Sequence, residues 1–136
     1  MFWMQATDYL SNQAKLSARE IIEHHVKCFR DGDVEGILAD YSDDAILFTP
    51  DRILKGREAI AGLFHRLLQE FREPHTTDAV RVAMFEGNYA YIVWSAETSD
   101  NIYEYASDTF VVQQGRIVMQ SFAAKVISKR FASVSL

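Results

Sequence analysis

The sequence has few of the features that mark particular protein classes. Its single cysteine, Cys28, allows no disulfide within the chain, and its position on the apolar side of a predicted helix favours a buried thiol over a nucleophile. No apolar run is long enough to span a bilayer, and the residues after Met1 lack the charged start and apolar core of a secretion signal. We therefore expect a cytoplasmic protein that does not enter a membrane.

Clusters of basic residues are also missing. The net charge is −5, and the scattered lysines and arginines argue against nucleic acid or an anionic membrane as the main partner. No glycine-rich loop precedes a helix, and the histidines and carboxylates lack the spacing of metal ligands. The sequence therefore predicts no metal and no cofactor. Its 136 residues contain no linker or repeat, which predicts one domain, 1–136, with an N-terminal extension, 1–16.

The first half of the chain shows the 3.6-residue period of helices. A capping box predicts that the first helix begins at Ser17. Asp33 can cap a second, short helix whose apolar spacing extends to Tyr41. Residues 45–49 have the composition of a strand, and a third helix with a wide apolar stripe ends before Pro74.

From Thr76 onward the period changes to two, which predicts four strands joined by turns at Gly87-Asn88, 99–101 and Gln114-Gly115. The sequence thus predicts an α+β cone of three N-terminal helices packed on a strongly curved, mostly antiparallel sheet. Neither face of the strand around Trp94 is polar throughout, so we expect both faces to be packed against other parts of the protein or a partner and shielded from solvent. Because three helices cover only the concave face, we expect a homodimer to cover the other.

The most specific pattern lies between Phe29 and Ile60. It consists of Gly32-Asp33, Glu35, Ile37-Leu38, Tyr41, Asp44-Ala45 and, after a strand, Lys55-Gly56-Arg57-Glu58-Ala59-Ile60. This order resembles the SnoaL-like and ketosteroid-isomerase-like branches of the nuclear transport factor 2 (NTF2-like) superfamily. The resemblance extends from about Ser17 to Ser128 and implies a cone-shaped fold with an apolar cavity, frequently dimeric through the sheet. The fold hosts many unrelated activities, and even non-enzymes.

The resemblance to ketosteroid isomerases can be carried over to single residues. Those enzymes use a carboxylate base on the first strand and an oxyanion hole of one tyrosine and one protonated aspartate. The base position matches Thr49, which cannot accept a proton at neutral pH. The oxyanion-hole tyrosine matches His25, and the oxyanion-hole aspartate matches Asp108 if the Gln114-Gly115 hairpin is one residue shorter. Supporting tyrosines match Tyr41 and Phe64, and Phe64 lacks the hydroxyl. Steroid isomerisation by the familial mechanism is therefore not expected.

Asp108 and His25 are the candidate catalytic residues. A buried aspartate is costly unless paired, so the alternatives for Asp108 are a structural ion pair with Arg52 or Lys125 and a cap for the N–H of a loop. A histidine on an apolar helix face can equally be a core residue. The expected ligand-binding residues surround this pair: Tyr41, Leu47, Thr49, Phe64, Tyr105, Phe110, Met119, Ser121 and Ala123.

These residues leave three functional classes open. The first is a cofactor-free isomerase, cyclase or dehydratase that moves a proton on a small apolar carbonyl compound, with Asp108 and His25 as acid, base or donor. The second is a binding module that holds a small apolar molecule without chemistry. The third is an interaction domain with a vestigial pocket. Thr49 in place of a base favours the second and third, whereas the polar pair favours the first.

Overall fold

The computed structural model describes residues 13–130, so most of the predicted extension, residues 1–12, lies outside the described part. The elements in chain order are η1 (Gln13–Lys15), α2 (Ala18–Asp31), α3 (Val34–Ala39), β1 (Tyr41–Phe48), β2 (Ile53–Lys55), α4 (Gly56–Phe71), β3 (Thr77–Glu86), β4 (Tyr89–Glu97), β5 (Asn101–Gln113) and β6 (Arg116–Ser128). Within the described residues, none of the helices combines the length and the apolar composition that a membrane-spanning helix requires.

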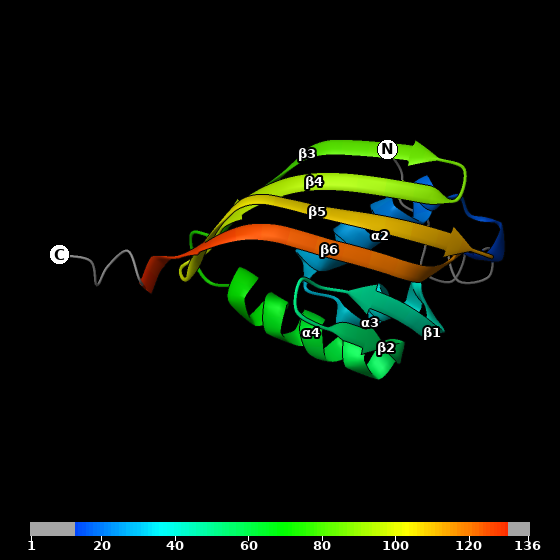
Figure 1. Ribbon diagram of the computed structural model, residues 1–136, viewed down its shortest axis with the longest axis horizontal. Coiled ribbons are helices and arrows are strands. Elements are labelled where there is room, and N and C mark those ends of the chain that lie inside the picture. The colour runs from blue at the N-terminus through cyan, green and yellow to red at the C-terminus, as the bar shows by residue number, and fades with distance from the viewer. Residues whose placement is uncertain (1–12, 131–136) are drawn as a thin grey trace.

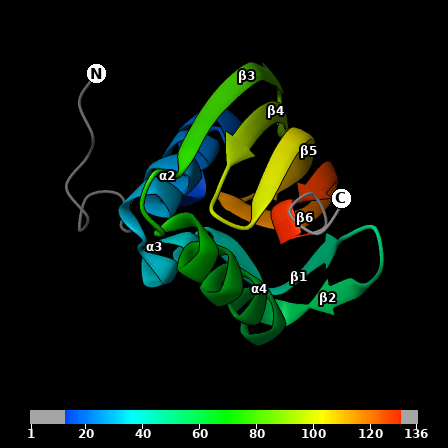
Figure 2. The same cartoon turned by 90° about the vertical axis from the view of Figure 1, so that its left-hand side faces the viewer.

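The six strands form one sheet in the order β2-β1-β6-β5-β4-β3. Strands β1 and β6 run parallel, and the other neighbouring pairs are antiparallel. The sheet curves strongly, and α2, α3 and α4 lie on its concave side (Figures 1 and 2). The predicted α+β architecture of three helices on a curved, mostly antiparallel sheet is therefore confirmed.

Local sequence signals set the helix ends. The Ser17 hydroxyl accepts a hydrogen bond from the Glu20 N–H, and the Glu20 carboxylate accepts one from the Ser17 N–H, which completes the predicted capping box of α2. Gly32 follows α2 with a φ of 69°, a conformation that glycine adopts at little cost. The Asp33 carboxylate accepts the Gly36 N–H at 2.9 Å and begins α3.

The boundary between α3 and β1 differs from the prediction. The apolar spacing predicts a helix as far as Tyr41 and a strand over 45–49, but α3 ends at Ala39 and Tyr41 begins β1. Pairing with β6 explains the difference, because the Asp40 carbonyl accepts the Ile117 N–H at 2.7 Å and Tyr41 lies opposite Ile117. Pairing across the sheet outweighs the helical spacing of a very short segment.

The hydrophobic core lies between the helices and the concave face of the sheet. Its fully buried side chains include Ile21, Ile22, Ile37, Leu47, Ile60, Phe110 and Ile117. Cys28 is buried in this core, as predicted, and burial raises the pKa of its thiol to about 12. Cys28 therefore stays protonated at neutral pH and is not an activated nucleophile.

Candidate functional site

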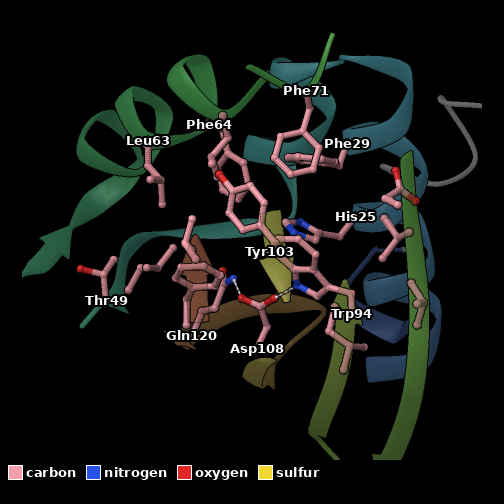
Figure 3. Close-up of a pocket in the computed structure, with 18 of the residues that line it drawn as sticks. His25, Phe29, Thr49, Leu63, Phe64, Phe71, Trp94, Tyr103, Asp108 and Gln120 are labelled. Carbon is pink, nitrogen blue, oxygen red and sulfur yellow. Dashed lines mark hydrogen bonds between the residues drawn. The ribbon is translucent and has the colours of Figure 1, made fainter. Parts of the chain in front are cut away.

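A cavity of about 310 Å³ lies between the concave face of the sheet and helices α2 and α4 (Figure 3). Most of its lining is aromatic or aliphatic: Val26, Phe29, Leu47, Leu63, Phe64, Leu67, Phe71, Ile92, Trp94, Tyr103, Phe122 and Val126. Polar side chains also line it: His25, Asp108 and Gln120, together with Arg30, Thr49, Asp51, Arg52 and Asp78. A mostly apolar cavity with few converging polar groups is typical of small-molecule sites.

Asp108 projects from β5 into the wall of the cavity (Figure 3). Its Oδ2 accepts a hydrogen bond from Trp94 Nε1 at 2.8 Å, and its Oδ1 accepts one from Gln120 Nε2 at 2.9 Å. Burial raises the pKa of Asp108 to about 6, and the two hydrogen bonds, which favour the charged form, limit that rise. A carboxyl group with this pKa can both accept and release a proton near neutral pH.

The alternative ion pairs of Asp108 do not form among residues 13–130. Arg52 Nε lies 3.6 Å from Asp51, and Lys125 Nζ lies 2.9 Å from Glu104. The two residues that bond Asp108, Trp94 and Gln120, are uncharged. When Asp108 is ionised, its negative charge is therefore held by hydrogen bonds and is not neutralised by a cation from this part of the chain.

Gln120 connects Asp108 to a buried tyrosine. The Tyr41 hydroxyl donates a hydrogen bond to Gln120 Oε1, so a continuous chain runs from Tyr41 through Gln120 and Asp108 to Trp94. Burial raises the pKa of Tyr41 well above its usual value, which keeps the hydroxyl protonated as a donor. Because its oxygen is occupied by Tyr41, the Gln120 amide turns its N–H toward Asp108.

His25 projects from α2 toward the same cavity (Figure 3). Its ring meets the rings of Tyr41, Phe64 and Phe110 edge-on, with centroid distances of 5.9, 5.5 and 5.5 Å. Burial, and to a lesser extent the charge of His24, lowers the pKa of His25 to about 4, so the imidazole is neutral at pH 7.

The Nδ1 atom of His25 is buried and has no hydrogen-bond partner among the described residues. A neutral imidazole has one donor and one acceptor nitrogen, and leaving a buried polar atom unsatisfied costs about 1–3 kcal/mol. The histidine thus combines the apolar packing of a core residue with an unused hydrogen-bonding capacity beside a cavity. A hydroxyl or carbonyl group of a bound molecule can use that capacity.

One wall of the cavity is an aromatic cluster. Trp94 lies 5.5 Å from Tyr103 and 6.3 Å from Phe122 between ring centroids. The Tyr103 hydroxyl donates to the Glu70 carboxylate at 2.8 Å, which ties this wall to the end of α4. Tyr103 and Phe122 therefore pack against the indole that donates to Asp108.

The structure brings together only part of the predicted site. His25, Leu47, Thr49, Phe64 and Asp108 all line the cavity. Two other predicted residues, Tyr41 and Phe110, are fully buried behind the lining instead. They support His25 and Gln120 from behind, and they do not face the cavity.

The remaining predicted residues lie off the cavity. Tyr105 is 51% exposed, and its hydroxyl is 3.2 Å from that of Tyr91 on the convex face. The alternation of β6 predicts that Met119, Ser121 and Ala123 face inward, but these residues do not line the cavity. A register shift between Val111 and Val112, where β5 pairs with β6, turns Gln120 and Phe122 inward in their place.

Thr49 lines the cavity without offering an acid or base. Its hydroxyl donates to Asp51 Oδ1 at 2.9 Å and accepts the Arg52 N–H at 3.1 Å, so it stabilises the loop between β1 and β2. Among the residues that the structure describes, no group of three or more histidine, cysteine, aspartate or glutamate side chains is placed to hold a metal ion.

Trp94, Tyr103, Gln120 and Phe122 are site residues that the sequence analysis missed. Trp94 carried a signal, because a tryptophan N–H in a buried strand needs an acceptor and Asp108 lies on the next strand. Gln120 and Phe122 carried none, because the bulge that turns them inward leaves no mark in the sequence.

The curved sheet with three helices on its concave face is the fold of solved NTF2-like structures, and this chain is an NTF2-like protein. A model of the SnoaL-like domain family matches residues 22–120, and the chain belongs to this family. No curated protein matches the chain.

Several solved structures share the fold at low sequence identity. A putative ketosteroid isomerase from Kribbella flavida is 14% identical with a TM-score of 0.66, over 79% of this chain and 77% of that one. A putative polyketide cyclase from Sinorhizobium meliloti is 12% identical with a TM-score of 0.64, over 76% and 93%. An NTF2-like protein of unknown function from Burkholderia xenovorans is 19% identical with a TM-score of 0.67, over 94% and 98%.

Proposed function

We propose that the cavity binds a small, largely apolar carbonyl compound and that Asp108 and His25 move a proton on it. One observation carries the proposal: a carboxyl group with a pKa of about 6 and a buried, neutral imidazole, unpartnered within the described residues, line the same apolar cavity. A base acts best when its pKa lies near the working pH, and a neutral imidazole can donate a hydrogen bond to a carbonyl oxygen.

In the proposed reaction the Asp108 carboxylate takes a proton from the carbon next to the carbonyl group. The electron pair of the broken C–H bond moves into the new C=C bond, and the carbonyl oxygen becomes an enolate. An N–H of His25 donates a hydrogen bond to that oxygen. Asp108 then returns the proton to another carbon of the conjugated system. Because the proton removed from one carbon is returned to another, the isomerisation needs no cofactor. Cyclisation or dehydration would begin with the same proton removal.

Trp94 and Gln120 align the proposed base. Each donates to one oxygen of Asp108, which leaves the remaining lone pairs of the carboxylate for the substrate. The names of the two similar structures described as a putative ketosteroid isomerase and a putative polyketide cyclase support a reaction of this class.

A second candidate function is binding without chemistry, and Thr49 favours it. By the resemblance to ketosteroid isomerases, this threonine matches the position of their base, and its hydroxyl is hydrogen-bonded to Asp51 and Arg52. A carrier would use Asp108 and His25 only as hydrogen-bonding groups. Measuring binding and proton transfer with one probe separates the two candidates.

The test follows hydrogen–deuterium exchange next to the carbonyl of 2-tetralone in D₂O by NMR. We expect exchange above the buffer rate with the wild-type protein and a loss of about 100-fold or more in Asp108→Asn. His25→Leu should slow exchange while keeping the fold. Tyr105→Phe, on the convex face, is the control and should exchange like wild type. Saturation-transfer signals without exchange would support the carrier, and neither signal would refute the proposed function.

We further propose that the chain forms a symmetric homodimer through the convex face of the sheet. Val82, Met84, Tyr89 and Tyr105 are large apolar or aromatic side chains on this face, each at least 38% exposed. The helices pack only on the concave face, so these side chains stay exposed unless a second copy of the chain packs against them.

A further inference from the structure

We infer that the molecule bound in the cavity carries a carboxylate, and that the Arg52 guanidinium receives this group at the rim. The inference rests on the proposed ligand-binding function and specifies its ligand. The ligand would be a small, apolar keto acid, with its carbonyl group inside the cavity and its carboxylate at the loop between β1 and β2.

Two arginines line the cavity, and they differ in their partners. Arg30 Nη2 donates to Asp78 Oδ1 at 3.0 Å, so its charge is already used to connect α2 to β3. Within residues 13–130, the guanidinium of Arg52 has only the carboxylate of its own neighbour, Asp51, and at 3.6 Å this contact is longer than a hydrogen bond. Arg52 is therefore the lining cation with donors left for an anion.

The backbone that carries Arg52 is held in a tight turn. The Arg52 carbonyl accepts the Thr49 N–H at 2.9 Å, and the Arg52 N–H donates to the Thr49 hydroxyl at 3.1 Å. The strands close on either side, where Phe48 pairs with Ile53. Thr49 supplies no acid or base, but it fixes the loop that presents Arg52 at the cavity.

The charges of the site also orient an anionic ligand. Ionised Asp108 has no cation beside it in the described part of the chain, so it repels a carboxylate from the inner part of the cavity. Asp51 and Asp78 also line the cavity, and the protein as a whole has a net charge of −5, so an acid needs a lining cation such as Arg52 in order to bind. The planar guanidinium can bind a carboxylate through two parallel hydrogen bonds.

The strength of this contact follows from its exposure. The Arg52 side chain is 54% exposed, so water and salt weaken its ion pairs. We expect the carboxylate to improve binding by about two- to fivefold. The effect should shrink as salt is added, which distinguishes it from apolar contacts.

The experiment compares oxo-phenylalkanoates of increasing chain length with their methyl esters by calorimetric titration. Each ester keeps the ring, the ketone and the length of the acid but removes the charge. Wild type should bind the best-fitting acid more tightly than its ester. Arg52→Gln should remove this preference, whereas Asp51→Asn should increase it by removing the competing carboxylate. Arg66→Gln is the matched control, because Arg66 is exposed on α4 and does not line the cavity.

The possible outcomes separate the two proposals. Equal binding of acid and ester by the wild type, at every chain length, would overturn the role of Arg52 and leave the ligand-binding function standing. An acid preference that persists unchanged in Arg52→Gln would do the same. If neither acids nor esters bind at any length, the proposed ligand-binding function fails together with the inference.

Discussion

The indole N–H of Trp94, on β4, donates a 2.8 Å hydrogen bond to Asp108 Oδ2 on the adjacent strand β5. This bond favours the ionised carboxylate, as does the bond from Gln120, whereas burial favours the protonated form. The pKa of about 6 results from these opposing effects. Burial and the hydrogen bonds from Trp94 and Gln120 thus set the proton affinity of Asp108, without a contribution from a neighbouring charge.

Replacing Trp94 by phenylalanine should raise the pKa of Asp108 above about 6, because one of two groups that stabilise the carboxylate is lost. The carboxyl ¹³C shift of Asp108, followed against pH, measures this value directly. Tyr103→Phe is the matched control, since it removes a hydroxyl from the same aromatic wall without touching Asp108. An unchanged or lower titration midpoint in Trp94→Phe would contradict the balance of effects described for Asp108.

His25 and Asp108 should give opposite pH dependences of stability. The pKa of His25 falls from 6.5 to about 4 on folding, so its contribution is complete above pH 6.5 and is lost as the pH falls toward 4. The pKa of Asp108 rises from 3.8 to about 6, so its contribution is complete below pH 3.8 and is lost as the pH rises toward 6. In the wild type the two dependences largely cancel between about pH 4 and 6.

Single substitutions expose each contribution. Between about pH 4 and 6, His25→Leu should lose about 3 kcal/mol of unfolding free energy as the pH rises, and Asp108→Asn should gain a similar amount. Urea denaturation at a series of pH values measures both slopes. If the two variants show parallel pH profiles, the burial of these groups does not govern their titration.

Tyr41 and Gln120 should behave as a coupled pair. Tyr41→Phe removes the donor to Gln120 Oε1, and Gln120→Leu removes both the acceptor of Tyr41 and a donor to Asp108. Each single change should cost about 1–3 kcal/mol, because a buried polar partner is left unsatisfied. A double-mutant cycle by chemical denaturation should show a coupling of about 1 kcal/mol. Strictly additive costs would mean that the hydrogen bond does not contribute.

The proposed dimer predicts a specific effect of charge on the convex face. Met84 is 56% exposed there, and Met84→Lys should convert a dimer to a monomer, because the lysine would be buried without a partner. Light scattering at micromolar concentration gives the mass. His65→Lys, on the exposed side of α4, adds the same charge elsewhere and should leave the dimer intact. A monomeric wild type would refute the proposal.

The sequence alone determined the fold of this protein, because the signals for the fold are local. The capping box at Ser17, the caps at Gly32 and Asp33 and the change of period near Thr76 each depend on residues a few positions apart. The same patterns supported the family assignment. The resemblance to ketosteroid isomerases then selected Asp108 and His25, and His25 also stood out as a polar residue on an apolar helix face.

Only the tertiary structure decided which side chains meet Asp108. A hairpin counted from Gln114-Gly115 without a bulge puts Ser121 opposite Asp108, but the register shift between Val111 and Val112 puts Phe122 there and turns Gln120 inward. One extra residue in one strand exchanges its inward and outward positions, here as far as a second register shift between Tyr103 and Tyr105. Nothing in the local sequence marks the shift, because it depends on how β5 and β6 pair along their whole length.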